Sequence, residues 1–111
     1  MRLPLLAVVV SMVLISSVTN AENPFTGNNL QILCEEAAST HVCDSYILGF
    51  LYGAWAQRAL GNPMCFPQSG VTPLQAKAVI EKYMREHPEN LHEQAWAVAA
   101  AALTAAFPCP K

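Results

Sequence analysis

Four cysteines are the residues in this chain best suited to chemistry, and their spacing excludes most of what thiols do in proteins. Redox-active pairs follow a C-x-x-C pattern, and no two of these cysteines lie that close together. Zinc sites pair ligands two to four residues apart, and haem attachment requires C-x-x-C-H; neither pattern occurs. We therefore predict that the cysteines form structural disulfides: Cys34, Cys43, Cys65 and Cys109.

The histidines and acidic residues do not form a recognisable catalytic set either. His87 and His92 lie five residues apart, so they do not share a helical face, and His41 stands beside the start of a predicted helix. No serine, threonine or cysteine has a base at a recognisable spacing. The chain is therefore not expected to be an enzyme, and neither a metal ion nor a cofactor is expected.

The first 21 residues have the composition of a secretory signal peptide. Arg2 supplies a positive charge, residues 3–15 are mostly apolar, and residues 16–21 are small and polar, with an acceptable cleavage site after Ala21. A retained membrane anchor is the alternative, although the apolar run is short for a span of about 20 residues. Cleavage would leave residues 22–111 as a single exported domain, free of the membrane, in a compartment where disulfides form.

The mature chain is small and acidic. Once Arg2 is removed, five basic residues stand against eight acidic ones, a formal net charge of −3. Because the chain has no basic patch, nucleic acid is not expected as a partner. A domain of this length is only marginally stable without cross-links, which gives the disulfides a purpose.

Apolar residues recur at helical spacing in four segments, and no strand-like alternation appears. The predicted helices are residues 28–37, 42–60, 72–87 and 94–107. Thr72 followed by Pro73 is typical of a helix start, and Pro88 ends that helix. Asn90 and Glu93 predict a second capping box before the fourth helix. The expected fold is all-α: a small four- to five-helix antiparallel bundle stapled by two disulfides.

The fourth helix is rich in alanine and apolar on every side. Such helices are usually buried, and this one is too short to cross a bilayer, so we predict a central core helix with Trp96 packed inside. Gly49 and Gly53 each cost the second helix about 1 kcal/mol relative to alanine. We predict that they allow the central helix to approach closely. The other aromatic residues expected in the core are Tyr46, Phe50 and Trp55. Because three short helices cover a fourth incompletely, a homodimer is expected.

The bundle topology selects one of the three possible cysteine pairings. In an up-down-up-down bundle the first helix ends where the second begins, which places Cys34 and Cys43 at one pole. The loop after the second helix and the end of the fourth helix share the other pole, which holds Cys65 and Cys109. Since bridged α-carbons lie about 4.4–6.8 Å apart, we predict the pairs Cys34–Cys43 and Cys65–Cys109.

A series of motifs spans nearly the whole mature chain, from about Phe25 to Cys109. It comprises Cys43-x-x-Tyr46-x-x-Gly49, Met64-Cys65-Phe66-Pro67, Gly70-Val71-Thr72 with Gln75, Lys82-Tyr83, Glu86-His87-Pro88-Glu89, His92, the alanine-rich helix and Phe107-Pro108-Cys109. In their order and spacing these motifs resemble the Rap/Tai family of type VI secretion amidase immunity proteins.

The resemblance implies a function that composition does not show. Members of this family are small helical periplasmic proteins that bind a peptidoglycan-cleaving amidase injected by another cell and block its active-site cleft without catalysis. Several of them are homodimers. The chain is therefore expected to be a periplasmic immunity protein. The alternative is a periplasmic stress chaperone or structural helical protein with the same fold and no toxin partner. An amidase gene beside its own would favour immunity.

The polar connection between the third and fourth helices is the first candidate for the contact with such a partner. It is charged, turn-forming and free of cysteine, and its acids could enter an electropositive cleft. The residues predicted to bind the partner are Glu86, His87, Glu89, Asn90, His92 and Glu93. The alternative is that the three glutamates only cap helix ends. The loop at residues 61–69 is the second candidate, with Met64, Phe66 and Pro67 as anchors.

Overall fold

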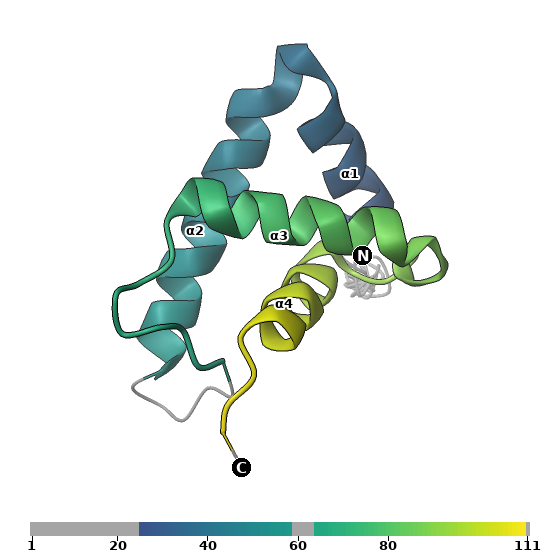
Figure 1. Ribbon diagram of the computed structural model, residues 1–111. Coiled ribbons are helices and arrows are strands. Elements are labelled where there is room, and N and C mark those ends of the chain that lie inside the picture. Colours follow the sequence, from purple (N-terminus) through teal and green to yellow (C-terminus); the bar gives the residue numbers. More distant parts are fainter. Residues whose placement is uncertain (1–24, 59–63, 111) are drawn as a thin grey trace, which may run out of the picture.

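The computed structural model describes residues 25–58 and 64–110, and these fold into four α-helices (Figure 1). The helices are α1, Gly27–Glu35; α2, Thr40–Arg58; α3, Pro73–Glu86; and α4, Ala95–Ala106. Short 3-10 turns follow α1 and α3: η2, Ala37–Ser39, and η3, Pro88–Asn90. The described residues contain no β-strand, only an isolated bridge between Thr26 and Gln94, so the all-α prediction is confirmed.

Two sequence predictions concern residues outside this range. The signal peptide at residues 1–21 is one, and the last two residues of the predicted second helix, 59 and 60, are the other. Within the described part of the chain, no helix is both long and apolar enough to cross a bilayer.

The helices pack in a more open arrangement than four rods side by side. α1 and α2 are antiparallel, meet at their short connection and spread apart from it (Figure 1). α3 crosses both of them. α4 packs along α3 and also contacts α1. α3 therefore contacts each of the other three helices.

Local sequence signals account for the start and end of α3. The hydroxyl of Thr72 accepts a hydrogen bond from the backbone N–H of Gln75 at 3.1 Å, and Pro73 occupies the first helical position. The helix ends at Glu86, two residues before Pro88, because the residue before a proline disfavours helical geometry. Both ends of this helix confirm the sequence prediction.

The predicted capping box of the fourth helix is wrong. Asn90 closes the 3-10 turn η3, and α4 begins later, at Ala95, after Gln94, whose side chain makes no capping hydrogen bond. The capping box that sequence analysis missed lies at the start of α1, where Thr26 and Asn29 hydrogen-bond reciprocally to each other's backbone N–H groups.

Only one face of α4 is buried, which corrects the prediction of a fully enclosed helix. The buried residues are Ala95, Val98, Ala99, Ala102 and Leu103. Trp96 points away from them, is 54% exposed and donates its indole N–H to the side chain of Gln94. Alanines tolerate exposure at little cost, so a uniformly apolar helix does not reveal which side packs. Trp55 is exposed as well, whereas Tyr46 and Phe50 pack against the core.

The glycines predicted to pack closely do not do so within the domain. A β-carbon added at Gly49 or Gly53 would meet nothing within 4 Å, because both residues lie on the exposed side of α2. The close approach occurs at Gly27 instead. A β-carbon there would lie 2.9 Å from Cγ2 of Val98 and 3.1 Å from the α-carbon of Leu91.

Both predicted disulfides are present. Cys34 at the end of α1 is bonded to Cys43 in the first turns of α2, with α-carbons 5.0 Å apart. Cys65 is bonded to Cys109 beyond α4, with α-carbons 4.9 Å apart. The pairing follows from which helix ends meet, as the pole argument requires, even though the helices cross more steeply than in a regular bundle.

Candidate functional site

The segment at residues 86–94, which comprises the last residue of α3 and the connection to α4, is fixed against the start of α1. The backbone N–H of Gly27 donates to the carbonyl of Glu93 at 2.9 Å, and that of Asn28 donates to the carbonyl of Leu91, also at 2.9 Å. Leu91 itself is buried, and its main chain comes close enough to α1 that a β-carbon at position 27 would be crowded. The connection is therefore held at a defined position on the surface.

The six residues predicted to bind a partner divide into two groups. Glu86, Glu89, His92 and Glu93 have exposed side chains. His87 and Asn90 are half-buried and brace the turn instead.

His87 and Asn90 both contact Tyr83 in the last turns of α3. The ring of His87 stacks on Tyr83 with centroids 4.1 Å apart, and His87 Nδ1 lies 3.0 Å from the carbonyl oxygen of Tyr83. The side-chain amide of Asn90 donates to the Tyr83 hydroxyl at 3.3 Å. The structure thus assigns four of the six residues to the accessible surface and two to its support.

The accessible side chains make this connection an acidic edge. Three of the four are glutamates, and residues 86–94 contain no lysine or arginine. Lys82 Nζ lies 3.8 Å from Glu86 Oε1, but both side chains are largely exposed and such pairs are weak. Three carboxylates of one sign favour a partner with a positively charged surface.

A shallow hollow of about 240 Å³ adjoins this edge between the ends of α3 and α4. Lys82, Tyr83, Glu86 and His87 line one wall, and alanines of α4 line the other. Its walls are formed by an aromatic pair, an ion pair and methyl groups. These features suit contact with a protein surface better than bond-making chemistry.

The second predicted contact loop offers less accessible surface than the sequence implied. Met64 and Phe66 are buried, and the Phe66 ring packs against both Trp55 and Phe107. They cannot anchor a partner without leaving the core. Only Pro67, of the three named anchors, is exposed, while residues 61–63 lie outside the described range.

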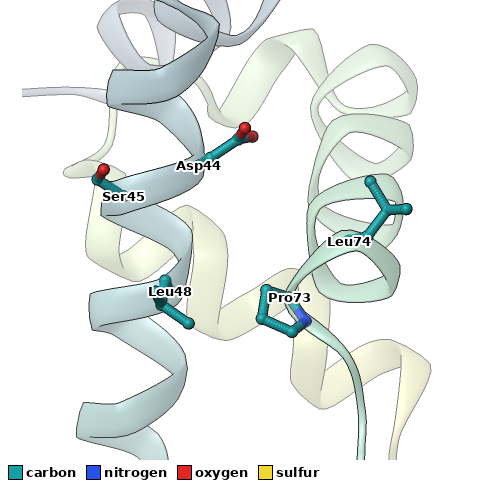
Figure 2. A pocket seen from close by; sticks show the side chains of 5 residues that line it. All are labelled: Asp44, Ser45, Leu48, Pro73 and Leu74. Carbon is teal, nitrogen blue, oxygen red and sulfur yellow. The ribbon is translucent and has the colours of Figure 1, made fainter.

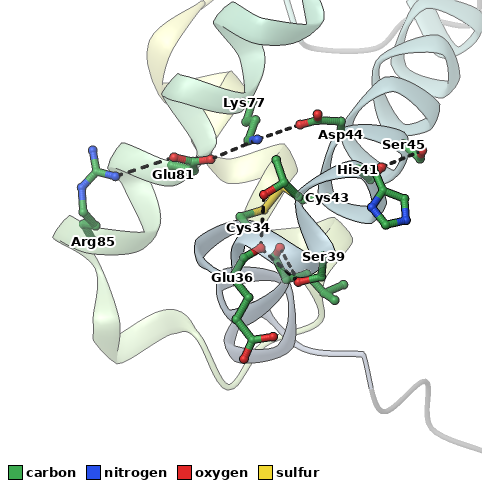
Figure 3. A network of polar contacts seen from close by, with 12 residues as sticks. Cys34, Glu36, Ser39, His41, Cys43, Asp44, Ser45, Lys77, Glu81 and Arg85 are labelled. Carbon is green, nitrogen blue, oxygen red and sulfur yellow. Dashed lines mark hydrogen bonds and ion pairs between the residues drawn. A yellow bond between two sulfur atoms is a disulfide. The ribbon is translucent and has the colours of Figure 1, made fainter.

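One group of metal-type ligands occurs among the described residues, at Cys34, Cys43 and Glu81. Because the two sulfur atoms are joined to each other, they offer no thiolate to a metal ion (Figure 3).

Glu81 belongs to a chain of ion pairs that links α2 to α3. Lys77 Nζ lies 2.7 Å from Asp44 Oδ1 and 3.9 Å from Glu81 Oε1 (Figure 3). The other carboxylate oxygen of Glu81, Oε2, lies 4.0 Å from Arg85 Nη1. We interpret this cluster as structural.

A half-buried tyrosine away from the acidic edge has a perturbed pKa. Burial raises the pKa of Tyr46, whose ring lies against that of Phe25 with centroids 5.3 Å apart. This tyrosine, which belongs to α2, is neutral at physiological pH and packs against the segment before α1. The contact between the two rings helps to fix the segment before α1 against α2.

Sequence analysis missed the residues that fix the acidic edge in place, above all Gly27 and Leu91. The signal available in the sequence was the capping pair Thr26 and Asn29, which places Gly27 at the first position of a helix. The sequence does not reveal that this helix start packs against a loop more than 60 residues later in the chain.

Comparison with known proteins confirms the resemblance noted in the sequence. Residues 26–109 match the family of Rap1a immunity proteins, a match that covers all four helices and both disulfides. The chain belongs to this family of immunity proteins. No curated protein and no solved structure matches the chain.

Proposed function

We propose that the protein is a periplasmic immunity protein that binds and inhibits a peptidoglycan amidase effector of type VI secretion. The observation that carries this proposal is the match of residues 26–109 to a family of immunity proteins. Two disulfides in a domain this small fit an exported protein in an oxidising compartment. The protein acts by binding alone and performs no reaction of its own.

In this proposal the acidic edge at residues 86–93 enters or covers the active-site cleft of the amidase. Glu86, Glu89, His92 and Glu93 supply the contacts, while His87 and Asn90 keep the turn rigid through Tyr83. A segment that is already ordered loses less conformational entropy on binding, which favours affinity. The fixed backbone of this connection is therefore an advantage for an inhibitor.

The protein works as a homodimer in the same proposal. The resemblance to immunity proteins that dimerise supports this part, as does the amount of apolar surface that the single chain leaves exposed. The acidic edge stays available for the effector in such an assembly.

The contact surface is tested by measuring the inhibition of a cognate amidase by a Glu86→Ala/Glu89→Ala/Glu93→Ala variant. We expect affinity to fall at least tenfold, since a few residues usually carry most of the binding energy. The matched control is Glu35→Ala/Glu36→Ala, which removes exposed acids from the far end of α1 and should leave affinity unchanged. Circular dichroism shows that each variant is folded. Equal affinity of the triple variant and the wild type would place the contact elsewhere.

A further inference from the structure

The outer side of α2 is apolar where a helix facing water should be polar. From residue 48 to residue 56 its exposed residues are Leu48, Gly49, Tyr52, Gly53, Trp55 and Ala56, and none of them is charged. We propose that this surface, together with Leu74 at the start of α3, is where a second copy of the chain packs. We call it the α2 face. The proposal rests on the homodimer proposed above and adds the location of its interface.

The α2 face exposes two large aromatic side chains and two leucines. Tyr52 is 70% exposed and Trp55 44% exposed. At about 150–250 Å² for each aromatic side chain, these two alone offer on the order of 200 Å². Leu48 and Leu74 extend the patch, and contiguous apolar patches larger than a few hundred Å² mark contact surfaces on soluble proteins.

The α2 face has both projecting and hollowed parts, as a self-complementary surface requires. A hollow of about 300 Å³ lies between α2 and α3, lined by Asp44, Ser45, Leu48, Pro73 and Leu74 (Figure 2). A smaller hollow of about 120 Å³ continues from Leu48 and Pro73 to Tyr52 and Trp55.

Leu74 stands at the rim of the larger hollow and is 78% exposed. In a two-fold assembly each surface meets its own copy, so Leu74 of each chain can enter the hollow of the other.

Charge favours a second copy as the occupant of the α2 face. The acidic group beside it, Asp44 in the wall of the larger hollow, is paired with Lys77, whose Nζ lies 2.7 Å from Asp44 Oδ1, so two copies bring no unpaired carboxylates together. The acidic edge, by contrast, would oppose glutamates to glutamates. Homodimer interfaces are also more apolar than those between transient partners. Of the two surfaces, only the α2 face can meet itself without repulsion.

The exposed glycines fit the same interface. Glycine lowers the helix propensity of α2 at positions 49 and 53, and among the described residues no neighbouring side chain lies within 4 Å of a β-carbon added at either position. Without side chains there, a second α2 can cross at a short interaxial distance. The packing of the two α2 helices would offset the helix propensity lost at the two glycines. The described part of the single chain offers no contact that offsets this loss.

The two interfaces do not compete. The α2 face adjoins the first turn of α3, and the acidic edge begins at Glu86, the last residue of that helix. The 14 residues of α3 separate them by about 20 Å at 1.5 Å per residue. A dimer built on α2 leaves both acidic edges open.

The test is the mass of the mature protein in solution, measured by sedimentation at micromolar concentration with no effector present. We expect the wild type to be a dimer and Tyr52→Glu to dimerise at least tenfold more weakly. Ile32→Glu is the matched control, because it places the same charge at an exposed apolar position on α1 and should leave the dimer intact. A monomeric wild type, or a Tyr52→Glu variant as dimeric as the wild type, would overturn the proposal.

Cross-linking decides the matter even if Tyr52→Glu fails to fold. Gly49→Cys adds a thiol where no neighbouring atom lies within 4 Å, so the fold should tolerate it. Under mild oxidation we expect a covalent dimer with this variant and none with Glu89→Cys on the acidic edge. The reverse pattern would contradict an α2 interface. Loss of amidase inhibition with the dimer intact would contradict the proposed function alone.

Discussion

At the scale of single residues, Gly27 holds the acidic edge in place by having no side chain. It lies where the start of α1, the buried Leu91 and Val98 of α4 converge. Its backbone N–H also donates to the carbonyl of Glu93. The residue thus connects the packing of the core to the position of the proposed contact surface.

We predict that Gly27→Ala destabilises the domain by about 1–3 kcal/mol, as overpacking of a closed site does. Its β-carbon would stand 2.9 Å from one carbon of Val98 and 3.1 Å from the main chain of Leu91, which cannot move independently of the loop. Urea unfolding measures the change in free energy. Gly49→Ala is the control: in dilute protein it should be neutral or stabilising by up to about 1 kcal/mol. Equal changes for the two variants would show that position 27 is not crowded.

Residue types alone could not distinguish these glycines before the structure was known. Gly49 and Gly53 attract attention because they interrupt a strong helix, whereas Gly27 stands at a helix start, where glycine is unremarkable. Whether a glycine is needed depends on atoms distant in sequence. For Gly27 those atoms belong to Leu91 and Val98.

At the scale of helices, two cross-links and one chain of ion pairs join elements that otherwise diverge. The disulfide Cys34–Cys43 closes the turn between α1 and α2, and Cys65–Cys109 ties the loop before α3 to the segment after α4. Because one bridge is local and the other is not, they should differ in what they contribute to stability.

We predict that replacing Cys65 and Cys109 by alanine costs more than replacing Cys34 and Cys43. The bridged residues are 44 apart in the first case and 9 apart in the second. Loop-closure entropy then gives about 4 kcal/mol and about 2.7 kcal/mol respectively. Denaturant unfolding of the two double variants compares them. A larger loss for the Cys34 and Cys43 pair would show that packing around those buried sulfurs outweighs loop closure.

The helices themselves were predictable because their signals are local. The Thr72 and Pro73 start and the Pro88 stop set the limits of α3, and the meeting of helix ends sufficed to pair the cysteines. The buried face of α4 was not predictable, because its alanines look alike on every side. The exposed face of α2 was not predictable either, because the sequence does not show whether an apolar residue faces the core or the surface.

At the scale of the whole molecule, the domain presents two surfaces of opposite character at the two ends of α3. The acidic edge is charged, ordered and fixed by backbone hydrogen bonds to α1. The α2 face is apolar and nearly free of charge. This division suits a small inhibitor that assembles through one surface and binds its effector through the other.

The connection at residues 86–93 was singled out from sequence by its charge and turn-forming residues. The structure adds that His87 and Asn90 support this turn while the glutamates remain accessible. The proposal that the effector is an amidase rests on the family resemblance, because the charge of the acidic edge favours a positively charged partner without specifying its activity.

The most direct test of the account is a titration of the mature protein into a type VI peptidoglycan amidase encoded beside its own gene. The release of peptide from peptidoglycan is the measured quantity. We predict that amidase activity falls in proportion to the protein added and is abolished near equimolar amounts, as expected for tight binding without turnover. Full amidase activity in the presence of a large excess of the folded, disulfide-bonded protein would contradict the proposed function.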